Sequence, residues 1–440
     1  MKNKLQILLL TIIIISFPSV SFSKVQTYIK EYTYQASEDD SRNSSRVTAM
    51  REVKRLLLEE LGTYLESVTE VKNFQLTKDQ ITALTAGIVK TEVVSEKWDG
   101  HTYWIKTKIV ADERDVIKSI DSLRKDREKS RELEEVKKRS DAILEENKNL
   151  REELKLAKGE DKENQKHNYD KSIKELSSID WIESGIRNGR KGDYNTSLQD
   201  FNKAIELSPN DASAYGNRGV TYQMLGKYYE AIVDYNKAIE LNPKYAEAYI
   251  NRGDSYDNLG KYYEAIDDYN KAIELNPNIA EAYINRGAAY IKLGKYYEAI
   301  DDYNKTIELN PEYAEAYFNR GAAYQKLGKY YEAIDDYNKA IVIDPKYADA
   351  YSNRGISYYQ LGKYNDAIDD FSRAIELNPK KANVYFIRSW IYSLIGNKKK
   401  AIEDLSKAIK INPDLRNDAK TNTAFDNIRN APEFKRLIDK

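Results

Sequence analysis

The strongest pattern of apolar and polar positions in the chain recurs every 34 residues, from residue 178 to residue 415. Each of its seven segments holds two amphipathic stretches with helical periodicity, separated by a glycine and closed by a proline. The prolines that mark the period are Pro209, Pro243, Pro277, Pro311, Pro345, Pro379 and Pro413. One helix pair cannot bury such apolar faces alone, so the pattern predicts seven pairs that stack into an all-α superhelix.

The segment at residues 246–279 shows which positions carry the pattern. Tyr249 and Gly253 lie on one side of its first helix, and Ala265 and Tyr269 face back from the second. Gly253 lets the two helices approach closely, where any side chain would hold them apart. These residue types at this spacing resemble the tetratricopeptide-repeat family, and the resemblance covers residues 178–415. It implies a concave face that holds a protein or peptide, with residues 416–440 as capping helices.

Residues 24–112 predict a small α+β domain instead. Three runs rich in β-branched and aromatic residues are expected to form strands, at residues 25–35, 88–98 and 101–110. Asp99-Gly100 joins the last two runs and is the pair that a two-residue type I′ hairpin requires.

The helices of this region are predicted between the first strand and the hairpin. One runs from Ser41 to Leu61 and is expected to stop at Gly62, and a shorter one begins with a capping box of Thr77 and Gln80. The order of elements predicts one helix-covered sheet. The arrangement loosely resembles the N-terminal domain of flagellar assembly protein T.

Residues 113–177 are expected to form a charged helical linker between these two parts. The positions of a coiled-coil seam follow at alternating spacings of three and four: Leu133, Val136, Ser140, Ile143, Asn147, Leu150, Leu154 and Ala157. A seam of this kind predicts a homodimer through residues 133–157, with Asn147 fixing its register. A solvated spacer helix explains the same pattern equally well. The fold class is therefore multidomain, with an α+β domain, a helical linker and an all-α solenoid.

Residues 1–23 have the composition of a secretory signal. Lys2 and Lys4 precede an apolar run from Leu5 to Phe17, and Pro18 follows it. A helix of that length spans about 20 Å, whereas a bilayer core is about 30 Å thick. We therefore expect cleavage, a periplasmic or secreted protein and no membrane span after cleavage; the alternative is an uncleaved anchor. The chain has no cysteine, which excludes a lipoprotein anchor, disulfides and a thiolate nucleophile.

Composition argues against several classes of function. Charged residues make up 32% of the chain, but the net charge is -1, so no overall field attracts nucleic acid. The two histidines, His101 and His167, are far apart, and the chain lacks metal-ligand spacings, a serine elbow and a phosphate loop. We expect a non-enzymatic protein without metal or cofactor. An active site within residues 24–112 is the enzymatic alternative.

One asparagine recurs at the same place in the first helix of five segments, and we call this set the asparagine column. Its members are Asn217, Asn251, Asn285, Asn319 and Asn353. A carboxamide can donate to and accept from one peptide group, so a ladder of amides suits an extended chain. The column resembles the asparagine ladder in the repeat domain of O-linked N-acetylglucosamine transferases. Ile250, Ile284 and Phe318 are expected to add apolar contacts, and the alternative is that these asparagines are ordinary helix surface.

An arginine and an aspartate sixteen residues later recur in the same way. The expected pairs are Arg218 with Asp234, Arg252 with Asp268, Arg286 with Asp302, Arg320 with Asp336, Arg354 with Asp370 and Arg388 with Asp404. Because an acid accompanies each arginine, we predict structural ion pairs rather than a strip for anionic ligands.

These observations predict a scaffold that binds a protein or extended peptide in its concave groove. The near-identity of the middle segments suits an extended or periodic ligand, and recent duplication explains it equally well. The alternative function is a structural accessory of polysaccharide export or envelope assembly. In that case tyrosine pairs such as Tyr262-Tyr263 would stack on a glycan.

Overall fold

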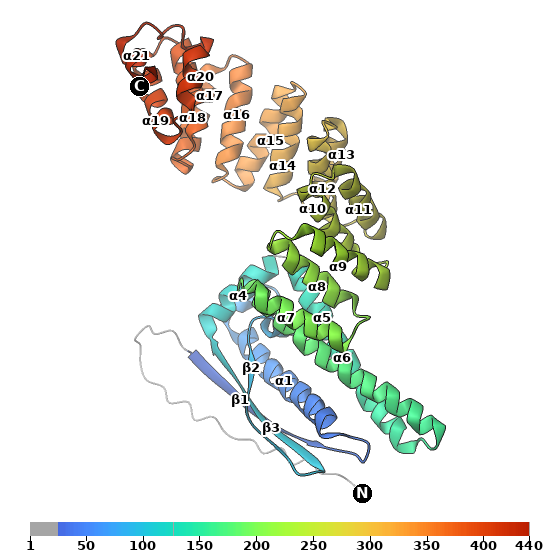
Figure 1. The fold of residues 1–440 in the computed structure, drawn as a ribbon. Helices are drawn as coiled ribbons and strands as arrows, with labels where there is room; N and C mark the ends of the chain where they lie inside the picture. Colours follow the sequence, from blue (N-terminus) through green and yellow to red (C-terminus); the bar gives the residue numbers. More distant parts are fainter. Residues whose placement is uncertain (1–24, 126, 440) are drawn as a thin grey trace, which may run out of the picture. The chain divides into compact units, whose positions relative to one another are not determined.

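The computed structural model describes residues 25–125 and 127–439 (Figure 1). The chain separates into two compact units with a boundary between Asn210 and Asp211, and each unit is described on its own. Unit 1 holds the first of the seven helix pairs, and unit 2 holds the other six. The expected export signal at residues 1–23 lies outside the described residues. No helix within the described stretches combines the length and apolar character needed to cross a bilayer.

Unit 1 contains three strands and seven helices among its described residues. In chain order they are β1 (Val25–Gln35), α1 (Arg42–Ser67), α2 (Thr69–Lys72), α3 (Lys78–Ala86), β2 (Thr91–Trp98), β3 (Thr102–Asp112), α4 (Glu113–Lys125), α5 (Arg127–Leu156), α6 (Glu160–Arg190) and α7 (Tyr194–Leu207). The strands form an antiparallel sheet in the order β1-β3-β2. α1 packs across β1 and β3, where Tyr103 and Ile105 of β3 are buried with Ala49 and Val53 of α1. The predicted helix-covered sheet is confirmed.

The two predicted helices start as expected, but the first one ends later. The capping box of Thr77 and Gln80 at α3 is confirmed. The prediction that Gly62 stops α1 is wrong, because α1 continues to Ser67. A Cβ atom at Gly62 would lie 2.6 Å from Oγ1 of Thr82 in α3. This glycine therefore serves the close packing of two helices rather than a helix end.

The predicted two-residue type I′ turn is also wrong. The β2–β3 ladder closes with Trp98 opposite Tyr103, which leaves residues 99–102 as the turn. Gly100 has a φ of +96°, but Asp99 keeps a negative φ, and a type I′ turn needs positive values at both. The carboxylate of Asp99 instead accepts hydrogen bonds from the N–H groups of His101 and Thr102, at 2.9 and 2.6 Å.

The expected coiled-coil seam packs inside the chain. Ile143 and its neighbour Leu144 in α5 are buried against Leu176 and Ile179 of α6. Nδ2 of Asn147 donates to Oγ of Ser172 in α6 at 2.9 Å, so the polar seam residue also has its partner in the same chain. A homodimer through residues 133–157 was expected because sequence spacing cannot show which helix covers a seam. In the structure α6 covers these positions within the chain, and the homodimer stays a prediction.

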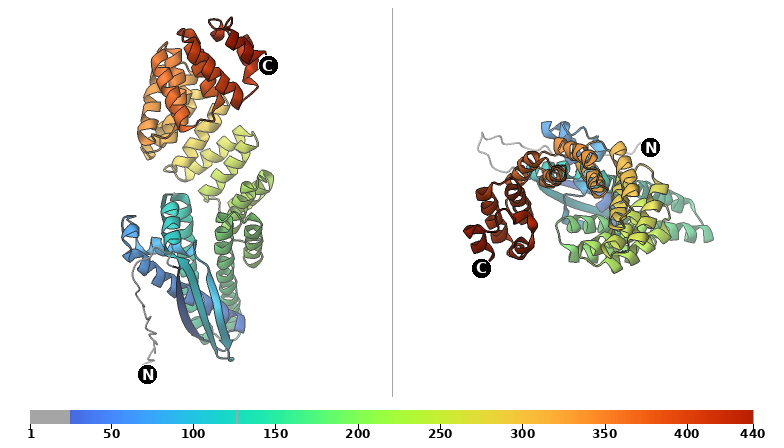
Figure 2. Two further views of the ribbon diagram at one scale, coloured as in Figure 1. Left: turned by 90° about the vertical axis from the view of Figure 1, so that its left-hand side faces the viewer. Right: turned by 90° about the horizontal axis from the view of Figure 1, so that it is seen from above.

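Unit 2 is the predicted all-α superhelix of helix pairs. The first helices of its pairs, called the inner helices, are α8 (Ala212–Met224), α10 (Ala246–Asn258), α12 (Ala280–Lys292), α14 (Ala314–Lys326), α16 (Ala348–Gln360) and α18 (Ala382–Leu394). The second helices, called the outer helices, are α9 (Tyr228–Leu241), α11 (Tyr262–Leu275), α13 (Tyr296–Leu309), α15 (Tyr330–Ile343), α17 (Tyr364–Leu377) and α19 (Lys398–Ile411). In the view from above in Figure 2, these pairs follow one another along a curved path.

The inner helices lie on the concave side of that curve. α8, α10, α12 and α14 each contact the next inner helix, whereas the main contacts of the outer helices are with inner ones. Glycines set the distance within a pair: a Cβ atom at Gly253 of α10 would lie 2.7 Å from the ring of Tyr269 in α11. The core of the array therefore repeats from pair to pair.

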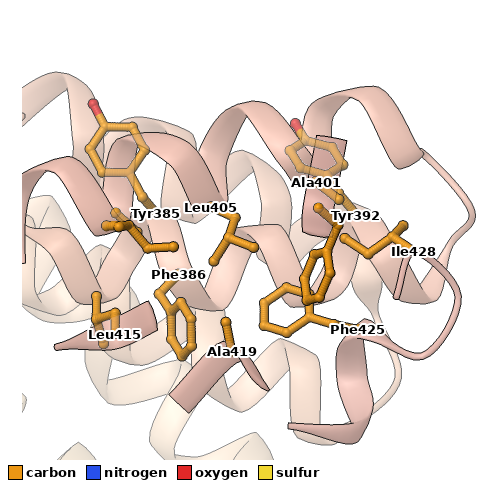
Figure 3. Packing of buried hydrophobic residues seen from close by; sticks show 12 residues of the cluster. Tyr385, Phe386, Tyr392, Ala401, Leu405, Leu415, Ala419, Phe425 and Ile428 are labelled. Carbon is orange, nitrogen blue, oxygen red and sulfur yellow. The ribbon is translucent and has the colours of Figure 1, made fainter. Parts of the chain in front are cut away.

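The C-terminal segment covers the end of the last pair. It contains α20 (Leu415–Thr421), the short 3-10 helix η1 (Thr423–Phe425) and α21 (Pro432–Ile438). Figure 3 shows Phe425 and Ala419 packed against Phe386 and Leu405 of the last pair. These residues bury an apolar face that a further repeat would otherwise have to cover.

Candidate ligand-binding face of the repeats

The asparagine column lies along the inner helices of unit 2, at one residue per helix from α8 to α16. All five side chains are half-buried, at the border between the core and the concave surface. Asn285 and Asn319 are each followed three residues later, on the same side of the helix, by a half-buried alanine, Ala288 or Ala322. Small side chains beside the amides leave space for a ligand backbone to approach them.

Two amides of the column already make hydrogen bonds within the protein. Nδ2 of Asn217 donates to the carbonyl of Ser213, one turn earlier in α8, at 2.9 Å. Nδ2 of Asn285 donates to Oδ1 of Asp254 in the preceding inner helix, also at 2.9 Å, and Asp254 accepts from the hydroxyl of Tyr269 as well. A carboxamide has two N–H donors and an oxygen acceptor. Each of these residues can therefore be held in place by one donor and still pair with a peptide group.

Of the three apolar residues expected beside the column, two are buried, and Phe318 is half-buried. Ile250 and Ile284 are 1% and 4% exposed and belong to the cores between helices. Phe318 packs its ring on Tyr347 and Tyr337, with centroids 4.9 and 5.8 Å apart. The prediction is wrong for Ile250 and Ile284, because a one-residue step around a helix moves a side chain from the concave surface into the stacking interface. For Phe318 it stays a prediction.

Charge on the concave side is negative. The first turns of the inner helices carry an acidic residue at the same place: Glu247, Glu281, Glu315 and Asp349. Asp254 and Asp257 add two carboxylates to α10 alone. This surface therefore disfavours an anionic ligand.

The recurring arginines and aspartates form bidentate ion pairs within each repeat of unit 2. In the central example, Nε and Nη2 of Arg286 donate to the two carboxylate oxygens of Asp302, at 2.9 and 2.5 Å. The same geometry holds for the other five pairs, which are Arg218–Asp234, Arg252–Asp268, Arg320–Asp336, Arg354–Asp370 and Arg388–Asp404. With both oxygens of the acid engaged, the arginines are structural groups.

The arginines also join one repeat to the one before it, which sequence reasoning missed. Nη1 of Arg286 donates to the amide oxygen of Asn270 in the preceding outer helix, at 2.5 Å. Arg252, Arg320 and Arg354 make the same contact with Asn236, Asn304 and Asn338, and Arg388 bonds to Ser372. A signal was present in the sequence, since an asparagine stands two positions after Asp234, Asp268, Asp302 and Asp336, and a serine two positions after Asp370. We call each such set of arginine, aspartate and asparagine an arginine clamp.

The pKa shifts in the clamps show which effect dominates. Burial raises the pKa of Asp268, Asp302 and Asp336, even though each carboxylate accepts two hydrogen bonds from arginine. The hydrogen bonds that Arg320 donates to Asp336 in turn raise the pKa of Arg320. Desolvation of the carboxylate is thus offset only in part, and a buried acid left without its arginine would destabilise the array.

A second periodic surface runs along the outer helices. It consists of four tyrosines, each 60–63% exposed: Tyr229, Tyr263, Tyr297 and Tyr331. A lysine from the next repeat lies over each ring; Lys295, for example, is 5.7 Å from the ring centre of Tyr263. We call this set of tyrosines and lysines the tyrosine ladder. Its cation–π contacts fix the rings while leaving them largely exposed.

Little in the described residues resembles a catalytic centre. No group of His, Asp and Glu side chains in that part of the chain is arranged to hold a metal ion. A cavity between α1, α3 and α5 measures about 40 Å³ and is lined mainly by apolar side chains, including Leu58 and Leu133. Such a volume holds roughly three water molecules rather than a substrate.

Comparison with known proteins agrees with the helix pairs. Models of the tetratricopeptide repeat match residues 190–226, 212–245, 246–279, 268–301, 287–328, 314–347, 348–381 and 382–415. The matches begin at residue 190, so the likeness of residues 24–112 to flagellar assembly protein T stays an expectation. Comparison with curated proteins gives no match.

Several solved structures are similar over the repeats. A tetratricopeptide repeat protein from Parabacteroides merdae is 26% identical, with 60% of this chain and 98% of that chain covered and a TM-score of 0.44. MamA is 32% identical, with coverages of 38% and 96% and a TM-score of 0.36. YrrB, described as a TPR protein with an unusual peptide-binding site, is 28% identical, with coverages of 42% and 95% and a TM-score of 0.37.

Proposed function

The chain belongs to the tetratricopeptide-repeat family, whose helix pairs form scaffolds for protein interactions, and we propose that its concave face holds an extended peptide segment of a partner protein. The observation that carries this proposal is the asparagine column, which places one half-buried amide on each of five consecutive inner helices. Amides at a fixed step read the ligand's backbone rather than its side chains. The acidic residues beside the column favour a peptide that is neutral or basic.

The proposal is tested by replacing three amides of the column. We expect the variant Asn251→Ala, Asn285→Ala, Asn319→Ala to lose at least tenfold in affinity for peptides that the parent selects from an array of overlapping 15-residue segments. Each lost peptide hydrogen bond is worth about 0.5–1.5 kcal/mol. The matched control replaces Lys271, Lys305 and Lys339 of the outer helices in the same repeats. Equal affinities for the parent and the amide variant, with both folded, would refute the column as a binding site.

A second candidate function rests on the tyrosine ladder. Four exposed rings at one step per repeat would stack on the sugars of an extended glycan, as a structural accessory of polysaccharide export requires. Each lysine of the ladder is accompanied by an exposed glutamate beside the tyrosine, such as Glu264, so the surface suits a neutral glycan. Affinity electrophoresis in a neutral polysaccharide gel tests it. Replacing Tyr263 and Tyr297 by alanine should remove the retardation of the parent protein by the polysaccharide. If the parent itself is not retarded, this function is excluded.

We place this scaffold in the periplasm or outside the cell, since residues 1–23 have the composition of a cleaved export signal and the chain has no thiol to oxidise. Cell fractionation with sequencing of the mature N-terminus tests the placement. A mature chain that begins near Lys24 in the periplasmic fraction is expected. An uncleaved chain in the cytosol or in the membrane would contradict it.

A further inference from the structure

The first helix pair of the repeats belongs to unit 1 and is complete there. Its first helix is the C-terminal part of α6, and its second helix is α7. Oγ of Ser197 in α7 donates to the carbonyl of Gly185 in α6 at 2.8 Å, and the ring of Phe201 lies against Gly185, where a Cβ atom would come within 2.8 Å. α6 itself is one continuous helix of 31 residues, so no joint separates this pair from the preceding segment.

The N-terminal domain lies on the side of α6 where a stacked repeat has its predecessor. In unit 2 that side of an inner helix packs on the preceding outer helix, as α12 does on α11. The residues of α12 buried with α11 are Ala282 and Ala289, and their equivalents in α6 are Asp180 and Arg187. In unit 1 these two residues reach the N-terminal domain, where Asp180 pairs with Arg51 of α1 and Arg187 donates to the carbonyl of Val89. α5 covers a further face of α6, where Ile179, the equivalent of Glu281, is buried with Ile143 and Leu144.

α1 takes the place of a preceding inner helix. In unit 2 the column residue Asn285 reaches back to Asp254 of the preceding inner helix. In the first repeat the equivalent residue, 34 positions before Asn217, is Glu183. Its carboxylate is 6% exposed and reaches α1, where Arg51 donates from Nη1 at 3.2 Å and Lys54 donates from Nζ.

Further contacts extend this interface in both directions along α6. One turn earlier, Asp180 pairs with the same two cations, at 3.2 Å from Nη2 of Arg51 and 3.4 Å from Nζ of Lys54. Toward the C-terminal end, Nη1 of Arg187 donates to the carbonyl of Val89 at 3.4 Å, and Arg190 reaches the carbonyl of Gly87. The N-terminal domain therefore covers the first repeat over several turns.

We infer that the face of the first repeat is a docking surface for the chain's own N-terminal domain, which covers that repeat in place of a preceding one. Glu183 has an anchoring role at the column position, where the later repeats carry an amide. The series of ligand-facing amides consequently begins at Asn217. The inference goes beyond the proposed peptide binding, because it assigns a role to residues 25–156 whatever the groove of unit 2 holds.

Hydrogen exchange of the full mature chain tests the cap. Replacing Glu183 by alanine removes the buried carboxylate from Arg51 and Lys54 and leaves them the more exposed Asp180 as a partner. This should raise exchange about 100-fold in both α1 and residues 172–190. Glu183→Asn, which installs the column amide, should do the same. The matched control is Glu175→Ala on the same helix, because Glu175 pairs only with Lys171 of α6 at 3.9 Å. Helices α12 to α15 should keep their protection in all three variants.

Two results would overturn the inference. One is exchange that rises in α1 while residues 178–190 stay protected, since the first repeat would then hold its order without a cap. The other is a Glu183→Ala variant that matches Glu175→Ala. If Glu183→Ala does not fold, Arg51→Met, Lys54→Met, Glu183→Met replaces the charges with apolar groups of similar size, and such exchanges preserve packing. The cap predicts parental protection for that triple variant, and lost protection in α1 and α6 would refute it.

Discussion

At the scale of residues, the repeated polar side chains divide into two groups with different roles. Arg252, Arg286, Arg320, Arg354 and Arg388 each pair with an aspartate in their own repeat and with an asparagine or serine in the preceding one. The asparagine column is half-buried on the concave side. Asn217 and Asn285 each donate one hydrogen bond from Nδ2 to another residue of the protein. Sequence spacing identified both groups, because a fixed period maps equivalent residues onto equivalent places.

The clamp predicts a large cost for removing one partner. Arg286→Ala leaves the carboxylate of Asp302 buried and unpaired, so we expect unit 2 to lose about 3 kcal/mol of unfolding free energy in urea. The double variant with Asp302→Ala should recover part of that loss. Lys305→Ala removes only an exposed pair with Glu308 and should change stability by at most about 0.5 kcal/mol. An Arg286→Ala variant with the same unfolding free energy as Lys305→Ala would show that the clamp does not stabilise unit 2.

Asp40 makes a prediction about acid. Burial alone would raise the pKa of Asp40, but hydrogen bonds from the N–H of Ser37 and from Tyr169, together with Arg151, lower it below its ordinary value. A lowered pKa in the folded state stabilises the fold above the unfolded pKa of about 3.9, and that stabilisation is lost as the pH falls through the folded pKa. Unit 1 should therefore lose stability below about pH 4.

Urea unfolding followed by tryptophan fluorescence at pH 7, 5, 3.5 and 2.5 measures this effect. Three of the four tryptophans, Trp98, Trp104 and Trp181, lie in unit 1. Asp40→Asn should be less stable than the parent at pH 7, and the difference should shrink as the pH falls below 4. Asp39→Asn, at the neighbouring residue, serves as the control with a smaller effect. A difference between parent and Asp40→Asn that stays constant with pH would contradict the assignment.

At the scale of elements, local patterns predicted where strands and helices begin better than where they end or what covers them. The first strand and the capping box at Thr77 follow from local residue types and were predicted correctly. Gly62 was misassigned because its small size serves α3, which lies beside α1 only in the folded chain. Ile250 and Ile284 were misassigned for a related reason, since the curvature of the superhelix decides which inner-helix positions face the groove.

The α5–α6 packing predicts how this seam responds to a core substitution. Ile143→Ala creates a cavity beside Leu176 and Ile179 and should lower the stability of unit 1 by about 2–5 kcal/mol. Because these residues meet within one chain, sedimentation velocity should give the same oligomeric state for this variant and the parent. A parent protein that is a dimer and dissociates on Ile143→Ala would contradict this prediction and support the homodimer that the sequence pattern suggested.

At the scale of the whole molecule, the chain joins a small α+β domain to a solenoid through a continuous helix. Sequence alone predicted the solenoid and its period, because the same residue types recur at the same core positions in each repeat. It did not predict that the boundary between units falls at residue 210, after the first repeat, since the residues that bind the N-terminal domain to α6 are more than 100 positions apart. The first repeat thus packs within unit 1, and the six repeats of unit 2 carry the concave face.

Site-specific photo-crosslinking tests the central claim, that this concave face holds a peptide, most directly. A crosslinking amino acid is placed at Ala288 on the inner helix α12 or at Glu274 on the outer helix α11, in the mature chain within its own compartment. The account predicts that the Ala288 position crosslinks a defined segment of one protein, and that a synthetic peptide of this segment competes it away. It also predicts loss of that crosslink when Asn251, Asn285 and Asn319 are alanine. Crosslinks from Glu274 alone, or crosslinks at Ala288 that survive loss of the amides, would contradict it.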